Sequence, residues 1–205
     1  MRPKRTSFLI GLFLVAQCLL ISQAHSATED YVTLRAPNEV KPFLLSDQYN
    51  QPFGLERLKN HWSLVFIGFT TCPDVCPVTL ANLEAVRAEM GLRLSPGLIP
   101  RILFLAVDPD RDIPVLKDYL AYFHPEYIGL TGEVSQIDNL IKSLNAFYRL
   151  DKKTPDDSEY DVLHTAFVSV INPRGEMVAK LNPPFHPHRT GDYLIQLIRG
   201  VQFDD

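Results

Sequence analysis

Short apolar runs stand out in the pattern of hydrophobic and polar positions along the chain. Residues 62–69 (WSLVFIGF) and 101–107 (RILFLAV) are rich in β-branched and aromatic side chains, and residues 127–130 (YIGL) form a shorter run of the same kind. Continuous apolar runs of this length are typical of buried strands. The pattern therefore predicts at least three strands in the interior of the protein.

Apolar residues at helical spacing mark four further segments. In the first of them, Pro77 suits the first helical turn and Gly91 suits the end of the helix. A different pattern follows near the C-terminus, where two β-rich segments flank the turn sequence NPRG and predict a hairpin. The predicted helices are residues 78–90, a stretch opening at Pro114, residues 134–147 and residues 190–199, and the hairpin strands are residues 165–171 and 176–181.

The order of these elements predicts the fold class. Strands and helices alternate first, which requires parallel strands joined by crossover helices, and the hairpin then adds antiparallel strands. The prediction is an α/β protein with a central mixed β-sheet and helices on both faces, the arrangement of the thioredoxin-like fold. We expect this domain to cover residues 43–205, after an extended lead-in at residues 27–42.

The N-terminal segment, residues 1–26, has the composition of a targeting sequence. A basic start with Arg2, Lys4 and Arg5 precedes an apolar run from Phe8 to Ile21, and small residues follow near Ala24. The run is shorter than the roughly 20 residues of a membrane-spanning helix. We expect residues 1–26 to be a signal peptide, with a membrane anchor as the alternative. Either one predicts export to the periplasm or to the outer face of the inner membrane.

Charge narrows the range of partners. The whole chain has a net charge of -4, with 20 basic and 24 acidic residues. The segment 1–26 contains three of the basic residues and no acidic one, so its removal leaves 17 basic against 24 acidic side chains and a net charge of -7. An acidic domain repels phosphate backbones. We therefore expect no nucleic-acid partner.

Two cysteines, Cys72 and Cys76, remain after the targeting segment. They lie between the strand at residues 62–69 and the helix that follows it, and the carboxyl end of a strand is where α/β folds collect reactive groups. A helix N-terminus also favours the thiolate form of a cysteine. Three intervening residues place the two sulfur atoms about one helical turn apart, where both can face one ion. A metal clamp is the favoured interpretation, and a structural disulfide or a buried thiol pair is the alternative.

Four blocks of sequence resemble the Sco/SenC family of copper chaperones. They are FIGFTTCPDVCP at residues 66–77, VDPDRDIP at 107–114, YIGLTG at 127–132 and YDVLHT at 160–165. The resemblance implies a thioredoxin fold that binds one copper ion, Cu(I) or Cu(II), through Cys72, Cys76 and His164. It also implies a role in maturing the dinuclear copper centre of cytochrome c oxidase. The chemistry agrees, since thiolates select Cu(I) and imidazole helps to hold Cu(II), whereas structural zinc usually takes a fourth protein ligand.

The resemblance implies a metallochaperone rather than an enzyme. Its expected partners are the copper-receiving subunit of cytochrome c oxidase and a thioredoxin-like reductant, and residues 1–26 leave membrane attachment open. A thiol–disulfide oxidoreductase that keeps the client's cysteines reduced is an alternative, and so is a copper or redox sensor. His164 distinguishes these functions, because thiol exchange needs only the cysteines. Two positions depart from the family pattern: Leu163 replaces a frequent aspartate and Ile113 replaces the usual threonine.

Other polar residues have weaker claims to a role. His186 and His188 lie in a proline-rich stretch that we expect to be a solvated loop, with an auxiliary copper ligand or a partner contact as the alternative. Asp108 either lines the site or braces its loop. The acidic run at residues 156–159 predicts a mobile loop with which His164 moves.

Overall fold

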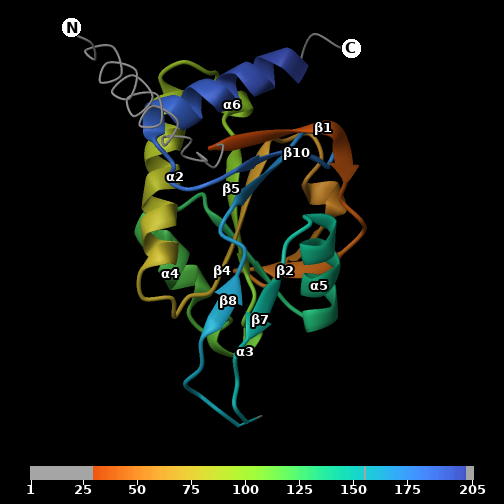
Figure 1. Ribbon diagram of the computed structural model, residues 1–205, viewed down its shortest axis with the longest axis vertical. Coiled ribbons are helices and arrows are strands. Elements are labelled where there is room, and N and C mark those ends of the chain that lie inside the picture. Colours follow the sequence, from red (N-terminus) through yellow and green to blue (C-terminus); the bar gives the residue numbers. More distant parts are fainter. Residues whose placement is uncertain (1–29, 155, 202–205) are drawn as a thin grey trace, which may run out of the picture.

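An eight-stranded mixed sheet runs through the middle of the molecule (Figure 1). The computed structural model describes residues 30–154 and 156–201, so the targeting segment predicted at residues 1–26 lies outside the described residues. The strand order is β1-β10-β9-β4-β5-β6-β2-β3, and β7 and β8 form a separate two-stranded sheet. The strands are β1 (Tyr31–Glu39), β2 (Leu44–Asp47), β3 (Pro52–Gly54), β4 (Ser63–Gly68), β5 (Arg101–Ala106), β6 (Ile128–Thr131), β7 (Tyr148–Leu150), β8 (Val162–His164), β9 (Val168–Ile171) and β10 (Glu176–Leu181).

The centre of the large sheet is parallel. Strands β4, β5 and β6 run side by side in one direction, with Phe66 opposite Phe104 and Phe104 opposite Gly129. Strands β9, β10 and β1 continue the sheet in antiparallel fashion on one side, and β2 and β3 do so on the other. Both phenylalanines are fully buried, as expected for strands that are covered on both faces. The predicted mixed sheet is confirmed.

Helices cover both faces of this sheet (Figure 1). Helices α2 and α4 lie on one side, α5 lies on the other, and α6 packs against α2. Among the described residues, no helix is both long and apolar enough to cross a membrane. The α-helices are α2 (Val75–Gly91), α3 (Pro109–Asp112), α4 (Leu116–Phe123), α5 (Val134–Ser143) and α6 (Pro187–Val201), and two short 3-10 helices, η1 (Leu55–Arg57) and η2 (Pro96–Leu98), lie in loops.

Several boundaries differ from the sequence prediction. Helix α2 begins three residues early, at Val75, so that Cys76 lies in its first turn. The stretch after Asp108, predicted as a loop, contains the short helix α3, because Pro109 favours a helical start and the Asp112 carboxylate accepts the Asp108 N–H at 3.0 Å. Helix α5 ends at Ser143 rather than at residue 147, and Asn145 follows it with a φ of 48°, which a helix does not allow.

Two short segments differ more strongly from expectation. Residues 31–39, predicted as part of an extended lead-in, form the edge strand β1 and pair with β10. His164, predicted to move with an acidic loop, lies in strand β8 directly opposite Tyr148 of β7. The residue that the family resemblance points to is therefore placed by a regular hairpin.

Candidate metal centre

The two cysteines lie where β4 turns into α2. Cys72 is half-buried in the connecting turn, and Cys76 is fully buried in the first turn of the helix. The backbone N–H of Cys76 donates to Sγ of Cys72 at 3.4 Å, and both cysteines are free thiols. This contact holds the Cys72 sulfur against the first turn of helix α2, and Cys72 is the more accessible of the two cysteines.

Gly68, the last residue of β4, makes room for the buried sulfur. A Cβ atom at this position would lie 2.8 Å from Sγ of Cys76 and 2.6 Å from Cε2 of Phe104. Both distances are shorter than side chains normally tolerate, so any larger residue would push the sulfur or the ring away. The glycine of the FIGF sequence thus lets Cys76 sit directly on the end of the strand.

His164 reaches Cys76 from the separate β7–β8 hairpin. Its Nε2 atom lies 4.0 Å from Sγ of Cys76, and its Nδ1 atom lies 3.0 Å from the carbonyl oxygen of Thr165. A carbonyl only accepts, so Nδ1 carries the proton and Nε2 turns its lone pair toward the sulfur. The rings of Phe66 and Phe69 meet the imidazole edge-on, with centroids 6.2 and 6.0 Å away, and fix its plane.

Burial controls the charge of these groups. It lowers the pKa of His164, against a smaller opposing effect of the bond to Thr165, so the imidazole is neutral at pH 7. Burial also raises the pKa of Cys76 far above its usual range, although a backbone hydrogen bond at Phe69 opposes the shift. The expected lowering of the thiol pKa by the helix N-terminus is therefore wrong for Cys76, because loss of solvent outweighs it. A metal must displace the proton of this thiol.

A buried carboxylate holds the turn that carries the cysteines. Oδ1 of Asp112 accepts two hydrogen bonds from Thr70, one from its N–H and one from its hydroxyl, both at 2.7 Å. The other oxygen, Oδ2, accepts the N–H of Asp108. Burial raises the pKa of Asp112, and the bonds from Thr70 and Asp108 oppose that shift. Asp112 thus ties the start of the cysteine turn to helix α3.

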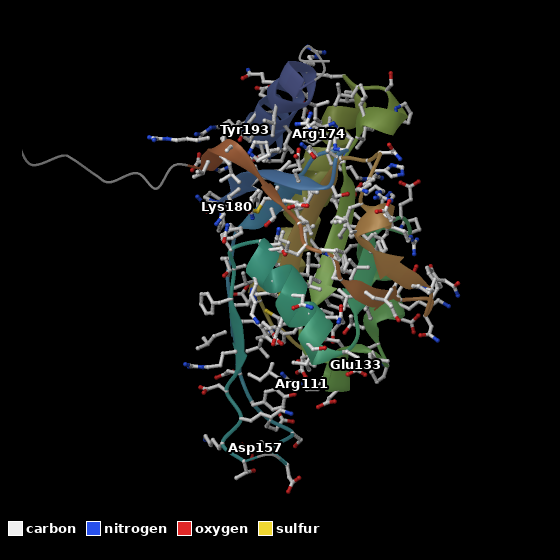
Figure 2. All side chains as sticks on the ribbon, turned by 90° about the vertical axis from the view of Figure 1, so that its right-hand side faces the viewer. Arg111, Glu133, Asp157, Arg174, Lys180 and Tyr193 are labelled. Carbon is white, nitrogen blue, oxygen red and sulfur yellow. The ribbon has the colours of Figure 1, made fainter. Side chains whose placement is uncertain are left out.

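Asp108 braces the loops and does not contact the sulfurs. Its two carboxylate oxygens accept the hydroxyl of Tyr160, each at 2.8 Å, and Oδ2 also pairs with Nε of Arg111. The Arg111 guanidinium donates to the carbonyl oxygen of Tyr160 at 3.1 Å and lies 3.7 Å from the centre of its ring. Figure 2 shows Arg111 beside the hairpin whose tip carries Asp157. Of the two roles expected for Asp108, the contacts support the brace.

The structure brings the predicted ligands together in pairs. Cys72 contacts Cys76, and Cys76 contacts His164. Within residues 30–154 and 156–201, no three His, Cys, Asp or Glu side chains lie close enough to hold a metal as they stand. A three-ligand site therefore requires a movement of Cys72 or of the hairpin. The donor set, two sulfurs and one imidazole nitrogen with a free lone pair, suits copper in both oxidation states.

The remaining histidines of the proline-rich stretch lie apart from this centre. His188 belongs to the first turn of α6 rather than to a loop, and its Nδ1 lies 3.1 Å from Oε2 of Glu89. Glu89 stands near the C-terminal end of α2, about 20 Å along the helix from Cys76 by the helical rise. His186 is exposed. Both residues are exposed, as expected, but His188 lies in helix α6 and not in the expected loop.

Leu163 shows what replaces the aspartate expected beside the histidine. Its side chain is 47% exposed, and it pairs across the hairpin with Arg149. The imidazole is oriented instead by the carbonyl oxygen of Thr165. Sequence reasoning missed this partner because every residue has a backbone carbonyl, so its use leaves no signal in the sequence.

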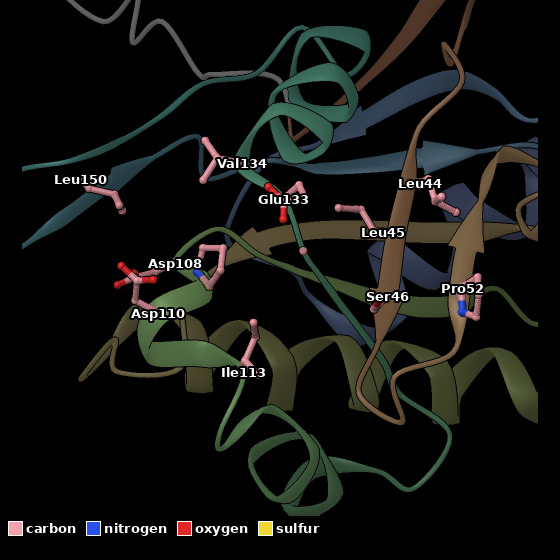
Figure 3. A pocket seen from close by; sticks show the side chains of 12 residues that line it. Leu44, Leu45, Ser46, Pro52, Asp108, Asp110, Ile113, Glu133, Val134 and Leu150 are labelled. Carbon is pink, nitrogen blue, oxygen red and sulfur yellow. The ribbon is translucent and has the colours of Figure 1, made fainter.

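Two surface hollows adjoin the brace. One, of about 500 Å³, lies between the cysteine turn and the hairpin tip and is lined by Thr71, Pro73 and Tyr160 among others. Figure 3 shows the other, of about 540 Å³, where Asp110 and Glu133 stand near apolar side chains from β2, α3 and α5. Neither cysteine nor His164 lines this second hollow. None of these three residues lines the first hollow either, although Thr71 and Pro73, the sequence neighbours of Cys72, do.

Most of the chain matches a known family model. The SCO1/SenC family model matches residues 32–199. A SCO2-like protein of Rickettsia prowazekii is 38% identical over 135 residues, which are 65% of this chain and 64% of that protein. The match therefore spans just under two thirds of the relative's own length.

Solved structures show the same fold. Bradyrhizobium japonicum ScoI, solved with copper bound, superimposes with a TM-score of 0.67 and 31% identity, covering 77% of this chain and 98% of that one. Yeast Sco1 with copper bound gives a TM-score of 0.73 and 29% identity, covering 80% of this chain and 90% of that one. The thioredoxin-like architecture predicted from the element order is thus shared with proteins that hold copper.

Proposed function

Because this chain belongs to the SCO1/SenC family, we propose that it is an exported copper chaperone that binds one copper ion through Cys72, Cys76 and His164. Its task is to assist assembly of the dinuclear copper centre of cytochrome c oxidase. The observation that carries this proposal is the approach of His164 Nε2 to Cys76 Sγ at 4.0 Å. The copper-bound state of the ScoI and Sco1 relatives supports the choice of metal.

The residues divide the work of binding according to their exposure. Cys72 is the half-buried thiol and meets the incoming copper ion first, and Cys76 completes the sulfur pair after losing its proton. His164 offers a neutral nitrogen whose tautomer is already fixed by Thr165. Cu(I) can be held by the two thiolates alone, whereas Cu(II) requires the imidazole nitrogen as an additional ligand. One site can therefore hold the cargo in either state.

Delivery of the cargo requires a recipient and a reduced cysteine pair. The proposed recipient is the copper-receiving subunit of cytochrome c oxidase, which must approach from the Cys72 side because Cys76 is fully buried. Outside the cytoplasm the two thiols tend to oxidise, and a disulfide cannot bind the metal. We therefore include a thioredoxin-like reductant among the partners of this chain.

A second candidate function is thiol–disulfide exchange on the client's own cysteines. The pairing of a half-buried Cys72 with a buried Cys76, both as free thiols, favours it. A copper or redox sensor is a third candidate built on the same residues. His164 discriminates among them, since exchange proceeds without an imidazole and copper retention does not.

Copper titration of the purified, reduced chain tests the proposal. We expect a stoichiometry of about one, and with Cu(II) an intense sulfur-to-copper charge-transfer band. A Cys76→Ser variant is the matched control, because it keeps the fold's volume but removes one sulfur, and it should lose the band. Stoichiometry near zero in the reduced wild-type chain overturns the copper function and favours the oxidoreductase.

Export is proposed from the composition of the segment 1–26 and has its own test. Residues 1–30 fused to a reporter that is active only outside the cytoplasm should give activity. The control fusion replaces Arg2, Lys4 and Arg5 by glutamate, which removes the basic start of the segment. A well-expressed but silent wild-type fusion overturns export. Retention of the exported chain in the membrane fraction separates an anchor from a cleaved signal.

A further inference from the structure

The two halves of the proposed copper site lie on separate parts of the fold. Cys72 and Cys76 follow a central strand of the eight-stranded sheet, while His164 lies on the β7–β8 hairpin, whose two strands pair only with each other. Figure 2 shows the far end of this hairpin extending away from the body of the molecule. The position of the imidazole therefore depends on what fastens the hairpin.

Asp108 and Arg111, at the start of and within α3, bind Tyr160, which lies four residues before His164. The hydroxyl of Tyr160 donates to the Asp108 carboxylate at 2.8 Å, and Nη1 of Arg111 donates to the carbonyl oxygen of Tyr160 at 3.1 Å. The guanidinium also stacks on the tyrosine ring, 3.7 Å from its centre. The Asp108 side chain is 1% exposed and that of Arg111 is 19% exposed, so these are contacts shielded from solvent. Hydrogen bonds to a shielded charge are stronger than those between neutral groups.

The cluster formed by these three residues is connected to the cysteine turn by two routes. The Asp108 N–H bonds Asp112, which in turn accepts both hydrogen bonds from Thr70, two residues before Cys72. The second route is aromatic: the Arg111 guanidinium lies 5.9 Å from the centre of the Phe69 ring, and that ring packs edge-on against His164. One arginine thus touches the hairpin and also the residue that sets the plane of the imidazole.

We propose that Asp108, Arg111 and Tyr160 form a latch that sets the approach of His164 to the cysteine pair. This inference rests on the proposed copper function and names the positioning residues of that site. With the latch closed, His164 faces Cys76, and a movement of Cys72 alone completes the three-ligand site that Cu(II) needs. With the latch open, the hairpin moves away and copper stays on two thiolates, the state from which a recipient can take it.

Removal of one hydroxyl tests the latch. Tyr160→Phe keeps the ring that Arg111 stacks on and deletes both bonds to Asp108. Arg111→Lys is the second variant, which retains the positive charge and loses the fork of donors. Tyr193→Phe is the matched control: its hydroxyl lies 2.7 Å from Oγ1 of Thr33. Figure 2 shows Tyr193 and Arg111 at opposite ends of the molecule.

The first readout needs no copper. Amide hydrogen exchange of the reduced, copper-free chain should become about tenfold faster in β8 for both latch variants and stay unchanged in β4 and β5. Tyr193→Phe should match the wild-type chain in all three strands. Unchanged exchange in β8 of the latch variants overturns the proposal, and this result is independent of whether the chain binds copper.

The second readout compares the two oxidation states of copper. The latch variants should bind Cu(II) about 10- to 100-fold more weakly, the usual effect of losing a group that orients a ligand, and should keep Cu(I) affinity within about threefold. Equal losses for both ions, with a lower melting temperature, would assign the cluster a purely structural role and overturn the latch. If the wild-type chain takes up no copper at all, the proposed function fails, and the exchange experiment alone decides the latch.

Discussion

The imidazole Nε2 of His164 and the buried sulfur of Cys76 lie 4.0 Å apart, although 88 residues separate them in the chain. Neither group carries a charge at pH 7, because burial raises the pKa of the thiol and lowers that of the imidazole. The two groups therefore do not form an ion pair in the copper-free chain. A metal ion at this position would bind the free nitrogen lone pair of His164 and replace the proton of the Cys76 thiol.

Loss of His164 should separate the two oxidation states of copper. We expect His164→Ala to weaken Cu(II) binding by at least tenfold, since Cu(II) loses its only nitrogen donor, and to leave Cu(I) on the two thiolates. Competition titrations with chelators specific for each ion measure both affinities. His188→Ala is the control, because His188 pairs with Glu89 on α2, far from the cysteines. Equal losses for both ions would contradict the assigned role of His164.

Oxidation of the cysteine pair should abolish copper binding. A Cys72–Cys76 disulfide removes both thiolates at once, so copper and the disulfide exclude each other. Copper at a free concentration 100 times its dissociation constant should stabilise the reduced chain by about 2.7 kcal/mol, seen as a higher melting temperature. Free thiols are counted before each titration. Copper binding as tight as that of the reduced chain, in a sample without free thiols, would refute the ligand assignment.

Substitution of Gly68 should disturb the buried sulfur. In Gly68→Ala the new methyl group meets Cys76 Sγ at 2.8 Å and the Phe104 ring at 2.6 Å, and overpacking of this kind costs about 1–3 kcal/mol. Urea denaturation measures the loss, and the copper affinity should fall with it. Gly97→Ala is the matched control, since nothing lies within 4 Å of a Cβ atom at that position. A Gly68→Ala chain as stable as Gly97→Ala would show that the strand end can shift freely.

The stability of the copper-free chain should fall as the solution becomes acidic. Burial lowers the pKa of His164 in the folded state below its ordinary value of about 6.5. Below that pH the unfolded chain binds a proton that the folded chain does not, so the free energy of unfolding decreases as the pH falls through about 6.5. His164→Gln should show a weaker dependence in this range. An NMR titration of the imidazole that gives a value above 6.5 would contradict the assignment.

Tyr119, which packs against the core, and Tyr127, which is buried in it, should respond differently to loss of their hydroxyl groups. The hydroxyl of Tyr119 is buried without a hydrogen-bond partner among the described residues, so Tyr119→Phe should leave the free energy of unfolding unchanged or raise it. The hydroxyl of Tyr127 donates to the Leu80 carbonyl oxygen and to Glu84, each at 3.2 Å. Tyr127→Phe should cost about 1–2 kcal/mol in urea denaturation. Similar losses in both variants would indicate a partner for Tyr119.

The central strands could be predicted because each has a clear local sequence pattern. Residues 62–69 and 101–107 are apolar almost throughout, and their short length and β-branched and aromatic side chains favour a buried strand over a buried helix. Strands β7 and β8 escaped prediction for the opposite reason. Both are very short and of mixed polarity, and the pairing of Tyr148 with His164 is decided by contacts that no local pattern encodes.

The site was predictable to a similar extent. Cys72 and Cys76 lie four positions apart, so their spacing alone indicated a joint role. His164 was found only through the resemblance of its block to a family, since a single histidine carries no spacing signal. Of the brace formed by Asp108, Arg111 and Tyr160, the sequence predicted only a possible bracing role for Asp108. The connection of the brace to the hairpin requires the tertiary structure, because 49 residues separate Arg111 from Tyr160.

Because β7 and β8 form a sheet of their own, a copper ion bound to His164 would also join this hairpin to the main sheet. Under the proposed function, copper held by Cys76 and His164 would link two residues that lie 88 positions apart, through bonds that can be undone. A covalent cross-link over a loop of that size stabilises a folded chain by about 4–5 kcal/mol, mainly by limiting the freedom of the unfolded chain. Copper would then act as a removable cross-link, and after its release the hairpin would be held by its side chains alone. On this proposal the copper-free chain is the more flexible of the two states, and a partner could distinguish them by flexibility as well as by charge.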